Sequence, residues 1–434
     1  MRNAARISSA QGIFLLGRLG RLGLLGLTLA AAPAPGADSI DVIALERAAR
    51  AGSPVLLAAR ARAQEALVLA EAAGVRGDPE LDLWVRNVLP TVTRTSERPL
   101  AVELEVVQPV RWPGKRGALE AVAAAETQAA LAEVVVAEQQ LVGEVRRTFA
   151  ELHAADREQR ILAEAHELLA LLQATASARF GSTQGDALAV LAAELAQDEH
   201  DQSLDVVFSR FQAARARLAE LAGVGAESLP LTVGALPTPV FAVREGPLPF
   251  DDRAPSVQAK SLRLAAAEHR LEAMRLGLKP DFGVGGGLLW PEGANPELTL
   301  KLGMELPFFR HRRFAPQVSA MESAVAAARA EVVAARLAGQ AAAVRLGAER
   351  DRLDRSLIRL AEAIVPRTSA ALDAGRIGFI NGDVTFAVLL DLFNDWFHAR
   401  IELANAEADR YGVWAESQAL AGVPLAELEP EARP

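Results

Sequence analysis

The sequence predicts a mostly α-helical protein with a small β part, in which the same order of helices and strands occurs twice. Three observations predict this fold: landmarks that recur about 200 residues apart, helical segments far longer than a globular domain needs, and short segments with alternating apolar residues. The 434 residues are 51% hydrophobic and include no cysteine. Such a chain is too apolar to be disordered, and it has no disulfide framework, thiolate metal site or Cys nucleophile.

Residues 1–37 are predicted to be a removable secretory signal peptide. They contain four arginines and no acid, and an apolar stretch from Leu22 to Ala32 leads into the small residues 34–37. A basic start, a short apolar core and small residues before the cut are typical of such signals. We expect cleavage near Ala37, which leaves a chain more acidic than its formal net charge of −9. Nucleic acid is therefore not an expected partner.

Paired landmarks indicate an internal duplication. Gly185-Asp186 corresponds to Gly382-Asp383, and Ala222-Gly223 corresponds to Ala421-Gly422. Because several such pairs keep their order at nearly constant spacing, we expect a tandem repeat of about 200 residues. The predicted organisation is a first repeat at 38–222, a proline-rich linker at 223–255, a second repeat at 256–422 and a C-terminal tail at 423–434.

Each repeat has the same predicted order: an alanine-rich helix, two strands and a long helical hairpin. The long helices are rich in Ala, Leu, Val, Glu, Gln and Arg, and all of these except Val are strong helix formers. A helix of about 60 residues is about 90 Å long, which is typical of a coiled-coil bundle or a helical tunnel. The predicted helices are 54–74, 117–180 and 186–222 in the first repeat, and 255–278, 317–374 and 384–421 in the second.

The strand segments alternate apolar with polar residues or glycine, so each strand has one apolar face. In lipid, unpaired backbone groups cost several kcal/mol each, so four strands could span a membrane only within a closed barrel shared by several subunits. The polar face would then line water. The alternative is an ordinary half-exposed sheet of a soluble domain. The candidates for the barrel lumen are Glu103, Glu105, Thr299, Lys301 and Glu305.

Basic clusters follow both strand pairs. Arg111, Lys115 and Arg116 come after the first pair, and Arg310, Arg312 and Arg313 come after the second. Two copies at corresponding places favour contact with lipid headgroups.

Together, these features resemble the TolC family of outer-membrane efflux channel proteins. The specific matches are Leu306-Pro307-Phe308-Phe309 with its following basic residues, Ile364-Val365-Pro366 with Gly375, and Gly382-Asp383 running on to Leu389-Leu390-Asp391. The resemblance implies a homotrimer whose twelve strands form one outer-membrane β-barrel, continued as an α-helical tunnel with a large periplasmic part. It also implies a Gram-negative host, a periplasmic adaptor (membrane fusion) protein and an inner-membrane pump of the RND or ABC type.

The tip of the second hairpin carries the candidate gate residues Arg376, Asn381, Asp383 and Asp391. In a threefold assembly each acid would occur three times around the axis, and such a ring favours cations. The resemblance makes Asp391 the acid nearest the closed end. Two plainer interpretations remain open: Asp383 as the N-cap of the following helix, and Arg376 as a surface residue instead of a latch.

The predicted function is a passive outer-membrane exit duct of a tripartite efflux system, for small molecules or metal cations. No catalytic residue, cofactor or metal site is expected, since the six histidines form no pair at short ligand spacing. The heavy-metal type of the family stays open, because the acylated N-terminal Cys of many such members is absent. The alternatives are the same fold in type I protein secretion and a soluble periplasmic coiled-coil scaffold.

Overall fold

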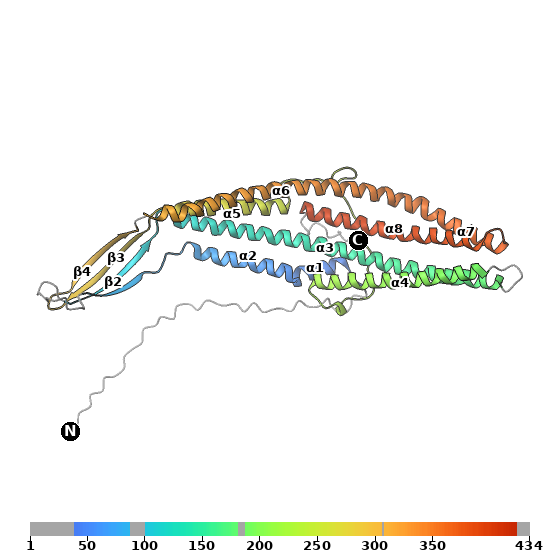
Figure 1. Cartoon of the computed structure of the whole chain (residues 1–434), viewed down its shortest axis with the longest axis horizontal. Coiled ribbons are helices and arrows are strands. Elements are labelled where there is room, and N and C mark those ends of the chain that lie inside the picture. The colour runs from blue at the N-terminus through green and yellow to red at the C-terminus, as the bar shows by residue number, and fades with distance from the viewer. Residues whose placement is uncertain (1–38, 87–99, 181–186, 306–307, 423–434) are drawn as a thin grey trace, which may run out of the picture.

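The computed structural model describes residues 39–86, 100–180, 187–305 and 308–422, so the predicted signal peptide and the C-terminal tail lie outside the described residues. The described chain is an elongated rod (Figure 1). A sheet lies at one end of the rod, and the tips of two long helical hairpins lie at the other. The order helix, two strands, long hairpin occurs twice along the chain.

The first pass consists of α1 (Val42–Gly52), α2 (Pro54–Ala73), β1 (Glu80–Arg86), β2 (Ala101–Val110), α3 (Lys115–Phe180) and α4 (Ala187–Ala222). A short 3₁₀ turn, η1 (Ala226–Ser228), follows in the linker. The second pass consists of α5 (Pro255–Leu276), β3 (Phe282–Pro291), β4 (Glu297–Met304), α6 (Arg310–Arg359), η2 (Leu360–Ile364), α7 (Val365–Asn381) and α8 (Phe386–Ala421). In the first pass α3 runs toward the far tip and α4 returns to the middle of the rod (Figure 1). In the second pass α6, η2 and α7 together reach the far tip, and α8 returns.

The four strands form one antiparallel sheet in the order β1-β2-β3-β4. Glu105 of β2 lies opposite Asp82 of β1 and Gly287 of β3, and Gly287 lies opposite Thr299 of β4. Within the described chain, β1 and β4 each have one edge without a paired strand. The sheet is therefore open at both edges.

Helix α1 was not predicted. Its N-cap is Asp41, whose side chain accepts a hydrogen bond from the amide of Ala44 at 3.1 Å. The helix buries Val42, Leu45 and Ala49 and ends at Gly52. Two residues later Pro54 begins α2, in the first turn of a helix, where proline is favoured. The helical periodicity of α1 covers only 11 residues, which is too few to predict a separate helix from the sequence.

The second hairpin differs from the prediction in two places. A π-helical turn, η2, precedes Pro366, which lies in the first turn of α7. Since proline lacks an N–H and its ring clashes with the carbonyl four residues back, the regular helix must open there. Helix α7 also continues to Asn381, well past the predicted end at 374. A Cβ on Gly375 would meet Leu392 at 2.6 Å, so this glycine serves close packing inside the hairpin.

The hydrophobic core runs along the hairpins and has buried charges at its centre. Phe149 and Leu152 of α3 and Phe393 of α8 are fully buried. Nearby, Arg146 donates to Glu46 at 2.6 Å and lies 4.9 Å from the ring centroid of Trp414. Buried charges need such partners, so this pair fixes α1 against α3 and α8.

The two hairpins also meet at a buried histidine. His200 of α4 lies 5.3 Å and 4.6 Å from the rings of Phe393 and Phe397 of α8. The pKa of His200 is lowered, first by burial and then by His166 and His398, while Glu199 and Asp201 act in the opposite sense.

Because the folded chain holds His200 neutral, we expect stability to fall as the pH drops below about 6.5, where the unfolded chain takes up the proton. His200→Leu should flatten this dependence, which for one group is at most about 1.4 kcal/mol per pH unit. Chemical unfolding between pH 7.5 and 5.5 measures it, with His269→Gln on α5 as the control. An equal slope in wild type and His200→Leu would contradict the expectation.

Candidate functional site

The exposure of the two sheet faces is the reverse of that in a soluble protein, where the apolar face is buried and the polar face meets water. One face is apolar and exposed: Leu298, Leu300 and Leu302 of β4 are 84%, 82% and 76% exposed, and Leu81 and Leu83 of β1 are 67% and 66% exposed. The register places Leu81 and Leu300 on the same face, through Val106 and Gly286. A continuous exposed apolar face of this kind marks an interaction surface.

The opposite face is polar and shielded. Glu103 and Glu105 are both only 5% exposed. Lys301 donates to Glu105 at 3.0 Å, and Arg86 pairs with Glu103. A carboxylate shielded from water needs such a partner, and removing one partner leaves an uncompensated charge. The two ion pairs therefore compensate the charges of Glu103 and Glu105 on this face.

Two glycines explain why this face is hollow. A Cβ on Gly285 would meet the carbonyl of Val106 at 2.6 Å, and one on Gly287 would meet the carbonyl of Leu104 at 2.5 Å. Only glycine permits this close approach of β2 and β3, and the missing side chains at 285 and 287 leave space on this face. The hollow is lined by Trp84, Arg86, Glu103, Glu105, Thr299 and Lys301, together with Leu300.

Four of the five lumen candidates thus lie on one face: Glu103, Glu105, Thr299 and Lys301. Glu305 lies beyond the end of β4 and is exposed, and its amide donates to the carbonyl of Asp281 at 3.0 Å. Arg86 and Trp84, which also line the hollow, were not among the predicted lumen residues. Both lie an even number of residues from Asp82 on β1 and therefore share its polar face. This alternation is the sequence signal that places them beside the lumen candidates.

At the junction between sheet and helices, one expected lipid contact is wrong. Lys115 is buried and donates to Asp281 at 2.9 Å and to the carbonyl of Lys279 at 2.7 Å. The amide of Trp112 also donates to Asp281, at 2.8 Å. Lys115 therefore ties the start of α3 to the start of β3, because a buried ammonium needs such acceptors.

At the tip of the second hairpin, Asn381, Asp383 and Asp391 are all exposed. Asp383 is not the N-cap of α8: that helix begins at Phe386, and the side chain of Thr385 caps it by accepting from the amide of Val388. Asp383 instead follows Gly382, which ends α7 with a left-handed φ of 90°.

The ion pair shown for Arg376 is with Asp373 of its own helix, at 3.8 Å. The expected latch between Arg376 and the acids at 383 and 391 is therefore not formed within one chain. The corresponding tip of the first hairpin, at 181–186, lies outside the described residues.

In the described ranges, no three His, Asp or Glu side chains are arranged to hold a metal ion. No helix in the described part of the chain combines the length and the apolar character that crossing a membrane requires.

Comparison with solved structures defines the class of fold. The chain is similar to the outer-membrane channel OprN, with a TM-score of 0.76 and 21% identity over 88% of this chain and 90% of that one. It is also similar to the outer membrane protein VceC of Vibrio cholerae, with a TM-score of 0.73 and 18% identity over 88% and 96% of the two chains. For the open state of the MtrE outer membrane channel of Neisseria gonorrhoeae, the TM-score is 0.68 and the identity is 15% over 88% of both chains.

At the level of sequence, no protein-family model and no curated protein matches the chain. The fold is that of outer-membrane channel proteins, with long helical hairpins joined to a four-stranded antiparallel sheet. The fold predicted from the sequence is confirmed.

Proposed function

We propose that the chain is the outer-membrane channel of a tripartite efflux system and acts as a passive exit duct. The observation that carries this proposal is the inverted sheet, with leucines up to 84% exposed on one face and carboxylates 5% exposed on the other. An apolar face of this size is stable against hydrocarbon and unfavourable in water. The shared fold with outer-membrane channels supports the same conclusion.

The open edges of β1 and β4 require pairing in lipid, where each unsatisfied backbone group costs several kcal/mol. We propose that β1 of one copy pairs with β4 of the next, so that three copies close a twelve-stranded barrel with Glu103, Glu105, Thr299 and Lys301 toward its lumen. The proposed repeats, 38–222 and 256–422, would each supply two strands and one hairpin. Three sets of hairpins would continue the barrel as a tunnel on the periplasmic side.

In this proposal the energy for export comes from an inner-membrane pump of the RND or ABC type, reached through a periplasmic adaptor protein. The helical tips, at the end of the rod opposite the sheet, are the proposed docking end (Figure 1). The cargo would be small molecules or metal cations. Type I protein secretion would use the same duct with a different pump, and the gene neighbourhood distinguishes the two.

Fractionation tests the membrane location. The protein is expected in the Sarkosyl-insoluble outer-membrane fraction, because its apolar sheet face is held in lipid. Release into the soluble periplasmic fraction would contradict the proposal and favour a coiled-coil scaffold.

The exposed acid Asp391 near the hairpin tip gives a prediction for conductance. Three copies near a common axis would form an anionic ring, which attracts cations. Asp391→Asn should reduce cation preference and weaken block by multivalent cations in planar-bilayer recordings. Folding should change little, since an exposed carboxylate contributes little to packing.

Glu362→Gln is the matched control, because Glu362 is an exposed acid of the same hairpin, remote from the tip. Equal selectivity and equal multivalent block in Asp391→Asn and wild type would make Asp391 an ordinary surface acid.

A further inference from the structure

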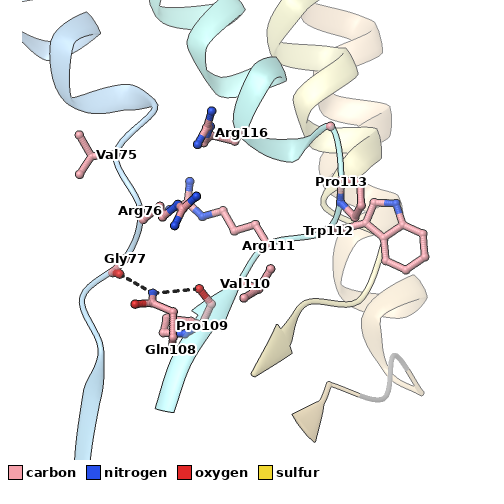
Figure 2. A pocket seen from close by; sticks show the side chains of 11 residues that line it. Val75, Arg76, Gly77, Gln108, Pro109, Val110, Arg111, Trp112, Pro113 and Arg116 are labelled. Atoms are coloured by element: carbon pink, nitrogen blue, oxygen red, sulfur yellow. Dashed lines mark hydrogen bonds between the residues drawn. The ribbon is translucent and has the colours of Figure 1, made fainter. Parts of the chain in front are cut away.

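A pocket at the junction between the sheet and the helices gathers three arginines (Figure 2). Arg76 lies between α2 and β1, Arg111 follows β2, and Arg116 lies in the first turn of α3. We call the pocket formed around these three side chains the arginine pocket. Its guanidinium groups point toward one another from three different segments of the chain (Figure 2).

The arginine pocket has an excess of positive charge. Arg116 pairs with Glu120 at 3.3 Å. In the described part of the chain, no carboxylate forms an ion pair with Arg76 or Arg111. Three converging cations with one counter-charge repel one another, and an anion placed between them relieves that repulsion. The excess charge therefore indicates a binding site for an anion.

The pocket is also held in shape without a ligand. The side-chain amide of Gln108 donates to the carbonyl of Gly77 at 2.8 Å and to that of Pro109 at 3.2 Å (Figure 2). The bond to Gly77 joins the segment that carries Arg76 to the end of β2, just before Arg111. The two arginines are thereby kept together at little cost on binding.

Apolar surface adjoins the pocket. Val75 and Val110, which line it, are 63% and 42% exposed, and Val110 shares the apolar face of the sheet with Val106 and Leu81. Trp112 lines the pocket too, stacked on Phe282 with ring centroids 5.5 Å apart. Aromatic rings of this kind occur at membrane–water interfaces. A ligand that fills the pocket and also covers this adjoining apolar surface must have an anionic head and apolar chains.

We propose that the arginine pocket binds the phosphate of an anionic phospholipid in the leaflet next to the helical part of the rod, with the acyl chains along the apolar face. This rests on the proposed membrane location. Guanidinium forks bind phosphate through paired, charge-assisted hydrogen bonds, which gives the headgroup a defined position. A bound lipid would fix the depth at which the sheet sits in the membrane.

The test uses the full-length protein in mild detergent and counts bound lipid by native mass spectrometry. Phosphatidylglycerol is titrated against zwitterionic phosphatidylcholine and against inorganic phosphate. We expect about one tightly retained phosphatidylglycerol per chain, and a preference over phosphatidylcholine of about tenfold or more. The double variant Arg76→Gln/Arg111→Gln should lose this preference, and Arg76→Gln alone should weaken it.

The control is Arg244→Gln/Arg367→Gln, which removes the same charge at two exposed arginines away from the sheet. This control should retain the lipid as wild type does. Equal retention of phosphatidylglycerol by the pocket variant and the control would overturn the proposal. So would complete displacement of the lipid by inorganic phosphate, which would assign the pocket to a free anion.

These outcomes are separable from failure of the proposed function. A protein that stays in the outer-membrane fraction but binds phosphatidylglycerol and phosphatidylcholine equally overturns the lipid site alone. A protein that Sarkosyl releases from the membrane overturns the proposed function.

Discussion

Replacing Arg350 with methionine is expected to destabilise the protein more than any other single change proposed for the helical part. Arg350 of α6 is completely buried. It donates to the carbonyls of Val243 and Gly246 at 2.5 Å and 2.9 Å, and to Asp351 at 2.6 Å. Methionine keeps much of the volume but makes none of these bonds. Losing two charge-assisted hydrogen bonds from this buried guanidinium to backbone carbonyls costs about 3–5 kcal/mol.

Arg350 matters because it anchors the linker to the second hairpin. Its guanidinium lies 5.7 Å from the ring centroid of Phe241. The hydrogen bond from Arg350, followed by the one from the amide of Gly246, holds the pKa of the Asp351 carboxyl below its usual range. Without Arg350 we expect the linker to detach from α6. Faster cleavage within 240–250 by a protease would report that detachment directly.

Urea unfolding followed by circular dichroism measures the effect. Arg352→Met is the matched control, since Arg352 is exposed and forms its ion pair with Glu349 on its own helix. It should shift stability by no more than about 0.5 kcal/mol. Similar unfolding midpoints for Arg350→Met and Arg352→Met would show that the buried guanidinium does not hold the linker.

The second large effect is expected on the apolar face of the sheet. Leu300→Arg places a charge where lipid should be, which costs about 2–4 kcal/mol near the middle of the bilayer. Leu300 is 82% exposed in the single chain, so a soluble protein would tolerate the same change. The variant should therefore fail to insert or to assemble, and the trimer expected of wild type in native mass spectrometry should be lost.

The neighbouring residue provides the control. Thr299 lies opposite Gly287 on the polar face, one residue from Leu300. Thr299→Arg carries the same charge at the same height but toward water, and it should insert and assemble normally. Equal loss of assembly in both variants would mean that the assignment of the two faces is wrong.

The sequence predicts the long helices and the strands well because their residue patterns are periodic. The predicted helices at 54–74 and 384–421 agree closely with α2 and α8. The sorting of apolar and polar residues onto opposite faces was also predictable, because it needs only a period of two. Such features depend on neighbours along the chain.

Features that depend on distant partners were not predictable. The pairing of Lys301 with Glu105 joins residues 196 positions apart, and no local pattern indicates it. No local pattern indicates a role for Arg76, because only the folded chain brings it close to Arg111. The end of α7 was misplaced because Gly375 looked like a helix stop, whereas it is a contact point with Leu392. Glycine has both uses, and the sequence alone does not distinguish them.

The most direct test of the account is the number of chains in the detergent-solubilised particle. If β1 and β4 are edges that pair between copies, a single folded chain should not persist, because its sheet would expose two unpaired edges. Native mass spectrometry of the purified protein should therefore give a stable trimer. A well-folded monomer with an intact sheet would contradict the shared barrel and, with it, the proposed duct.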